Sequence, residues 1–207
     1  MNGMINGIEG IKAAIENGPR GESVFLKLAD GDSVTLRFLN EMDESGATYD
    51  ENRGLCYGFY EHLDPEDFTK SFVCTLDEEG KCQGCERIGI NKRWRPKGRL
   101  FFNALIRGKR GETDVVKVFT TGTSEKGLAP QLVEYAVDYG SLCDRDYKLT
   151  RRGEGLKTSY TLTSRDVSPL SDADNAAELI VLTALARQLN YEEQGELLSG
   201  STRGSDW

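Results

Sequence analysis

Four residues of this chain have the types and the spacing of a metal site. The single histidine, His62, is followed by Cys74 and then by Cys82 and Cys85, in the order H-x11-C-x7-C-x2-C. Zinc takes four nitrogen or sulfur ligands in a tetrahedron, and a C-x2-C pair can supply two of them. Because residues 62–85 lack hydrophobic periodicity, a metal would replace the core that this segment does not have. We therefore predict one structural zinc ion per chain, held by these four side chains.

The remaining cysteines leave one alternative for the fourth ligand. Cys56 is a candidate, but it lies within a predicted strand and before His62. Cys143 is remote from the others and is predicted to pack on the helix that precedes it. Free cysteines can also pack as small apolar groups without a metal. Three cysteines in twelve residues of a polar loop that contains glycine fit that explanation poorly.

Aromatic and basic side chains occur together in several other segments. Cations that follow phosphates and rings that stack on splayed bases are the means by which proteins hold single-stranded nucleic acid. Trp94 is the leading stacking candidate because it lies among the cations of residues 92–97. Strand side chains alternate between faces, so Phe101 and Phe102 cannot both contact a ligand. The predicted DNA contacts are Tyr57, Phe59, Lys92, Arg93, Trp94, Arg95, Lys97, Arg99, Phe101, Tyr147, Arg151, Arg152, Lys157 and Tyr160.

The sequence contains no recognisable catalytic set. It has neither a phosphate-binding P-loop nor a dinucleotide-binding glycine fingerprint. The one histidine is already assigned to the metal, so no histidine is left to activate a nucleophile. We therefore predict a binding protein and not an enzyme.

The elements that must position these residues are mostly short strands. Apolar and alternating patterns predict seven strands, and Ala- and Leu-rich segments predict helices. The strands are predicted at 24–28, 34–38 (with one wet face), 55–60, 99–106, 115–120, 147–151 and 158–162, and the helices at 130–138 and 174–190. A helix between barrel strands is typical of the OB-fold, a five-stranded Greek-key barrel. The predicted class is thus mainly β, an OB-fold with a zinc-bearing insertion and a C-terminal helix.

The predicted organisation has three parts. Residues 1–20 form an amphipathic arm, and residues 21–165 form the OB-fold core, whose zinc subdomain covers about 55–98. Residues 166–207 form an acidic C-terminal helix and tail.

The charge is distributed unevenly along the chain. The formal net charge is −8, which alone would argue against a nucleic-acid partner. Residues 81–126, however, carry 12 basic and 4 acidic side chains, whereas residues 166–207 carry 2 basic and 8 acidic ones. Local patches set the field of a protein. The pattern indicates a polyanion groove on an acidic body, with solvated surface charge as the alternative.

No export signal or membrane span is evident in the sequence. The longest stretch of large apolar residues, 179–182, is far shorter than a bilayer requires. We expect a reducing compartment and no disulfide framework for the five cysteines.

These features together resemble the zinc-containing single-stranded DNA-binding, or helix-destabilising, proteins of T-even and related tailed phages. The resemblance rests on the opening strand pair at 24–39, the order of the four metal ligands, and the segments at 99–104 and 153–160. It spans about residues 24–162. The ligand order is its most specific part.

The resemblance implies an OB-fold with zinc beside a DNA cleft, in the cytoplasm of an infected bacterial host. It implies coating of single strands during replication, recombination and repair, self-association through an N-terminal arm, and replication partners recruited by an acidic tail. The chain departs from the family pattern in having few basic residues in its arm and no dense acidic tail.

A second function remains open from the sequence. The chain could be a zinc-stabilised adaptor whose basic face binds an acidic protein. The acidic segment 166–207 could shield the basic groove, although an ordinary packed helix at 174–190, with or without a mobile 191–207, explains the same residues.

Overall fold

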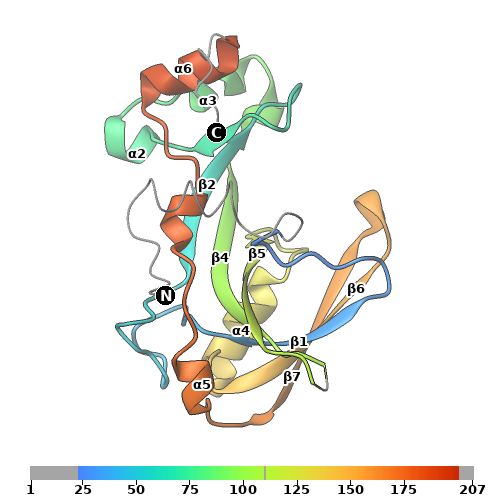
Figure 1. Ribbon diagram of the computed structural model, residues 1–207. Coiled ribbons are helices and arrows are strands. Elements are labelled where there is room, and N and C mark those ends of the chain that lie inside the picture. Colours follow the sequence, from blue (N-terminus) through green and yellow to red (C-terminus); the bar gives the residue numbers. More distant parts are fainter. Residues whose placement is uncertain (1–22, 110, 201–207) are drawn as a thin grey trace.

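The computed structural model describes residues 23–109 and 111–200, and its strands form one antiparallel sheet (Figure 1). The prediction of a mainly β protein is confirmed. The predicted arm at 1–20 lies outside the described residues. The seven strands are β1 (Ser33–Phe38), β2 (Tyr57–Leu63), β3 (Ser71–Val73), β4 (Lys97–Ile106), β5 (Val115–Gly122), β6 (Arg145–Arg152) and β7 (Ser159–Val167).

Strand β4 is the centre of the sheet. The strand order is β3-β2-β4-β1-β6-β7, and β5 also pairs with β4. One edge of β4 pairs first with β2, where Tyr57 lies opposite Phe101, and then with β1, where Leu36 lies opposite Ile106. The other edge pairs with β5 along eight residues. The predicted strand at 24–28 is reduced to a single parallel bridge between Phe25 and Val118.

The main hydrophobic core lies on one face of the sheet, under helix α4 (Ala129–Tyr139), which matches the helix predicted at 130–138. Alternate residues of β1 and β4 point into this core, as strand geometry requires. The buried side chains are Leu36, Phe38, Phe102, Ala104, Phe119, Leu128, Leu132, Leu142, Cys143, Tyr147, Leu149 and Leu162.

A second, smaller core lies in the insertion between β1 and β4. We call residues 57–96 the metal subdomain; it contains the β2–β3 hairpin and the short helices α2 (Leu76–Glu79), α3 (Gln83–Glu86), η1 (Arg87–Gly89) and η2 (Lys92–Trp94). Its buried residues are Phe72, Cys82 and Trp94. Leu197 and Leu198, from the far end of the chain, pack against the same cluster.

The C-terminal region differs from its prediction. The helix expected at 174–190 is wrong: only α5 (Asp172–Asn175) and the 3-10 turn η4 (Leu182–Leu185) interrupt an otherwise extended segment. Figure 1 shows this segment following β2 and β4 from α5 up to α6 (Tyr191–Ser199), which lies over the metal subdomain. The sequence leaves open a mobile tail from residue 191 onward, but residues 191–199 form a helix that packs on the metal subdomain.

A buried ion network fastens the start of that segment to the sheet. Arg37, expected on a wet face of β1, is fully buried and donates to Asp146 at 2.6 Å and to Ser168 Oγ at 2.6 Å. Arg107 donates to Asp146 at 3.1 Å and to Asp174 at 2.8 Å. Burying the Arg37 charge is tolerated because it is paired and hydrogen-bonded.

Candidate metal centre and nucleic-acid interface

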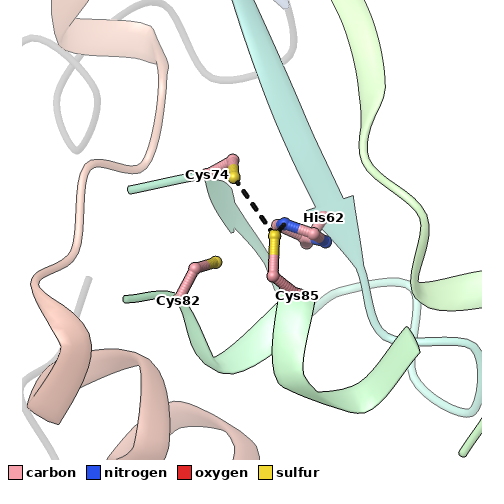
Figure 2. A group of neighbouring side chains, drawn as sticks. All are labelled: His62, Cys74, Cys82 and Cys85. Atoms are coloured by element: carbon pink, nitrogen blue, oxygen red, sulfur yellow. Dashed lines mark hydrogen bonds between the residues drawn. The ribbon is translucent and has the colours of Figure 1, made fainter. Parts of the chain in front are cut away.

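The four predicted ligands come together inside the metal subdomain (Figure 2). His62 lies on β2, Cys74 follows β3, Cys82 is the N-cap of α3, and Cys85 lies within α3. Their ligand atoms all lie within 4.8 Å of one another. The hairpin brings the first two ligands together and the C-x2-C turn brings the other two. This group is close enough to hold one metal ion.

The distances between the ligand atoms suit one tetrahedral ion. Cys74 Sγ and Cys85 Sγ are 3.6 Å apart, and Cys85 Sγ is 3.5 Å from His62 Nε2. Bonds of ~2.3 Å to zinc place two sulfurs of a tetrahedron about 3.8 Å apart. A disulfide would need a separation of about 2.05 Å. The thiols are therefore spaced as ligands and not as a bonded pair.

The orientation of the His62 ring also suits a ligand. Its Nδ1 lies 2.6 Å from the backbone oxygen of Trp94, so Nδ1 carries the proton and Nε2 faces the thiols. A histidine that binds a metal commonly donates its other N–H in this way. Gly84 allows the close packing, because a Cβ there would come within 2.3 Å of the ring.

The electrostatics of the thiols favour a cation. Burial opposes ionisation of Cys82, but interactions with the His62 ring and with the backbone N–H groups of Cys85 and Thr75 outweigh it and lower the pKa of Cys82 to about 6. Burial, followed by the neighbouring thiols, raises the pKa of Cys85 to about 12. A divalent cation would supply the charge that lets the remaining thiols ionise. The donor set therefore fits a metal ion.

The other two cysteines are not part of this group. Cys56, the alternative fourth ligand, packs against the main core, and burial raises its pKa to about 11. Cys143 is buried in the main core, and burial raises its pKa well above the ordinary value. Both act as small apolar side chains.

Trp94 does not lie where the sequence predicted. It is only 8% exposed and packs in the core of the metal subdomain, with the Arg87 guanidinium 5.9 Å from its ring. Trp94 is the last residue of the 3-10 turn η2, in which Lys92 and Arg93 are exposed while Trp94 is buried. The prediction that Trp94 is a stacking platform for DNA bases is therefore wrong.

The predicted DNA contact of Tyr147 is also wrong. It is fully buried in the main core, 5.3 Å from the ring of Phe38. Phe101 and Phe102 face opposite sides of β4, as alternation requires, but both are buried.

The aromatic face of β2 and β4 is covered by the chain itself. Tyr57 and Phe59 stack 5.2 Å apart, and Phe101 packs edge-on against Phe59 at 5.0 Å. The segment 180–185 lies over these rings, with Leu182 buried against Phe101. Two hydrogen bonds between the Asn103 side chain and the backbone of Ile180, at 2.8 and 3.1 Å, hold it there. These three rings therefore belong to a third hydrophobic cluster.

Most of the predicted cations are exposed. Lys92, Arg93, Arg95 and Lys97 are exposed at the end of the metal subdomain, as are Arg152 and Lys157 on the β6–β7 hairpin. Two arginines have structural partners. Arg151 donates to the backbone oxygen of Leu28, and Arg99 donates to Glu61 at 2.9 Å.

An open cleft lies between β5 and the start of β7. Its volume is about 420 Å³, and its lining includes Arg99 from β4 and Tyr160 from β7, both predicted from the sequence. Lys126, Leu26 and Leu28 line it as well, and sequence reasoning missed them. Lys126 lies in a turn without periodicity, and the two leucines alternate in a segment that reads as an ordinary strand.

Comparisons of this chain with protein-family models, with curated protein sequences and with solved structures find no match. Within the described residues, no helix has the length and apolar character needed to cross a bilayer.

Proposed function

We propose that this protein binds single-stranded DNA without sequence preference. The observation that carries the proposal is the cleft between β5 and β7, because basic segments distant in sequence border it. Arg99 and Lys126 line the cleft, as do Thr158–Tyr160 of the β6–β7 hairpin. Arg152 and Lys157 are exposed elsewhere on that hairpin, within six residues of this lining segment. Phosphate neutralisation by such cations supplies sequence-independent affinity. The net charge of −8 is compatible with this because local patches set the field.

The order of the strands supports an OB-fold as the scaffold. With residues 24–38, β4, β5, β6 and β7 taken as the five barrel strands, α4 lies between the third and the fourth, where the OB-fold has its helix. The metal subdomain is then inserted between the first two strands, and the β6–β7 hairpin is the loop between the last two. Both loops border the oligonucleotide face in that fold.

The metal in this proposal is a structural zinc ion. His62, Cys74, Cys82 and Cys85 would hold it, and four protein ligands leave no open position for a substrate. The ion would fix the metal subdomain, and with it the exposed cations of η2 and the start of β4. The resemblance to the phage proteins extends the proposal to the role of the protein. It would coat single strands in replication, recombination and repair, self-associate on DNA and recruit partners through its C-terminal region.

The salt dependence of binding tests the function. Each phosphate neutralised on a single strand contributes about −0.7 to the log–log slope of affinity against salt. Lys157→Ala should therefore reduce the steepness by up to about 0.7 and weaken binding to every sequence alike. Arg165→Ala is the matched control, because Arg165 is an exposed cation of β7 about 20 Å from the hairpin end in which Lys157 lies. Salt-independent affinity, or equal losses in the two variants, would contradict the proposal.

A further inference from the structure

The aromatic residues predicted to contact DNA differ in how accessible they are to a ligand. The rings of Tyr57, Phe59 and Phe101 are covered by residues 180–185, and Gln188 donates to the Tyr57 hydroxyl at 3.1 Å. Tyr160, in contrast, is 45% exposed and lines the cleft. Among the described residues, the exposed ring of Tyr160 is therefore accessible to a base.

The lining of the cleft has two kinds of surface. Leu26, Leu28 and Leu149 contribute apolar side chains, of which Leu149 belongs to the buried core. Arg99 and Lys126 contribute cations. The ion pair with Glu61 compensates the charge of Arg99 and fixes its guanidinium, whereas Lys126 is exposed. Apolar walls with a few placed polar groups are typical of small-ligand sites, whose volumes run from roughly 300 to 1,000 Å³.

We infer that this cleft takes one unstacked base of a bound single strand, with the base against Tyr160 and the leucines and the adjoining phosphate beside Lys126. The inference rests on the proposed function and names the position within it. A base offers a planar face for the tyrosine and the leucines, and its neighbouring phosphate offers a negative charge for the lysine. Bases stacked and paired in a duplex cannot enter it without being extruded. The cleft therefore also gives a reason for preferring single strands over duplex.

Variants of Tyr160 test the inference by affinity. Base–aromatic stacking is worth roughly 1–3 kcal/mol, so Tyr160→Ala should weaken binding of oligo(dT) about 5- to 150-fold. Tyr160→Phe keeps the ring and should bind like the wild type. Tyr60→Ala is the matched control, because Tyr60 is a more exposed tyrosine (61%) that is not among the residues lining the cleft. An abasic oligonucleotide of equal length should bind Tyr160→Ala and wild type alike.

Photocrosslinking locates the base directly. Oligo(dT) carrying 5-iodouracil should crosslink to the tryptic peptide 158–165, which contains Tyr160. Crosslinking to peptide 54–70, which contains Tyr57 and Phe59, would overturn the inference and require segment 180–185 to move. If the wild type binds oligo(dT) and Tyr160→Ala binds equally well, the inference fails while the function stands. If the wild type does not bind, the proposed function fails and the inference with it.

Discussion

Gln194→Ala removes the buried side chain through which helix α6 makes hydrogen bonds to the metal subdomain next to the metal ligand Cys82. Gln194 is fully buried, and its Oε1 accepts from the backbone N–H of Gln83 at 3.0 Å. Its Nε2 donates to Thr75 Oγ1 at 3.0 Å and to the backbone oxygen of Leu189 at 2.9 Å. Gln83 immediately follows the metal ligand Cys82, so this one side chain links the C-terminal helix to the metal centre.

The expected cost follows from these three hydrogen bonds. At about 1 kcal/mol net for each, the substitution should destabilise the protein by about 3 kcal/mol. For a domain of 150–250 residues this lowers the Tm by roughly 6–12 °C. Calorimetry of the metal-loaded protein measures the change. Gln194→Leu keeps most of the volume and should show a loss of the same order, because the hydrogen bonds and not the packing are removed.

Glu196→Ala is the control for this prediction. Glu196 lies on the same helix but is exposed, so its substitution should move the Tm by less than about 2 °C. If Gln194→Ala behaved like Glu196→Ala, α6 would not be an integral part of the metal subdomain, and the account of the C-terminal region would be refuted.

Two further predictions concern the metal and the ion network. Elemental analysis of protein purified without added metal should find close to one equivalent of zinc, which Cys82→Ser should lose and Cys56→Ser should keep; zinc retained by Cys82→Ser would contradict the ligand assignment. Burial opposes ionisation of Asp174, but the interactions with Arg107 and Ser171 together outweigh it and hold the pKa of Asp174 below its usual value. The stabilisation from this carboxylate is therefore present above pH ~4 and is lost as the pH falls through the folded-state value. Urea unfolding should therefore show Asp174→Asn to be about 1–3 kcal/mol less stable than the wild type at pH 7 and nearly equal to it well below pH 4. Asp172→Asn, at an exposed position, should match the wild type at every pH. A pH-independent difference for Asp174→Asn would refute this account.

The metal centre could be predicted from the sequence because its signal is chemical and local. Four ligand residues in a short segment without hydrophobic periodicity leave few alternatives, and the structure brings together the same four. Most strands of the sheet could also be predicted, since period-two alternation marks β1 and apolar runs mark β4 and β5. The three-residue strand β3 could not be predicted, because it lies in a segment without periodicity. The pairing partners of the strands could not be predicted either, because pairing is set by contacts distant in sequence.

The predictions that failed concern residues whose conformation and burial are set by contacts distant in sequence. The Ala- and Leu-rich segment 174–190 has a helical composition, but the two hydrogen bonds that Ile180 exchanges with the Asn103 side chain and packing on Phe101 hold it extended. Trp94 lies among cations in the sequence, yet a three-residue turn directs it into a core that α6 completes from more than 90 positions away. Local propensity is a weak guide where distant contacts decide the conformation.

A competition titration tests the central claim most directly. The protein is bound to a labelled oligo(dT), and unlabelled oligo(dT) or a duplex of the same length is added at moderate salt while fluorescence anisotropy reports the bound fraction. The account predicts that the unlabelled single strand displaces the label at comparable concentration and that the duplex requires at least tenfold more. Equal competition by duplex, or no binding of oligo(dT) at low salt by the zinc-loaded protein, would contradict it.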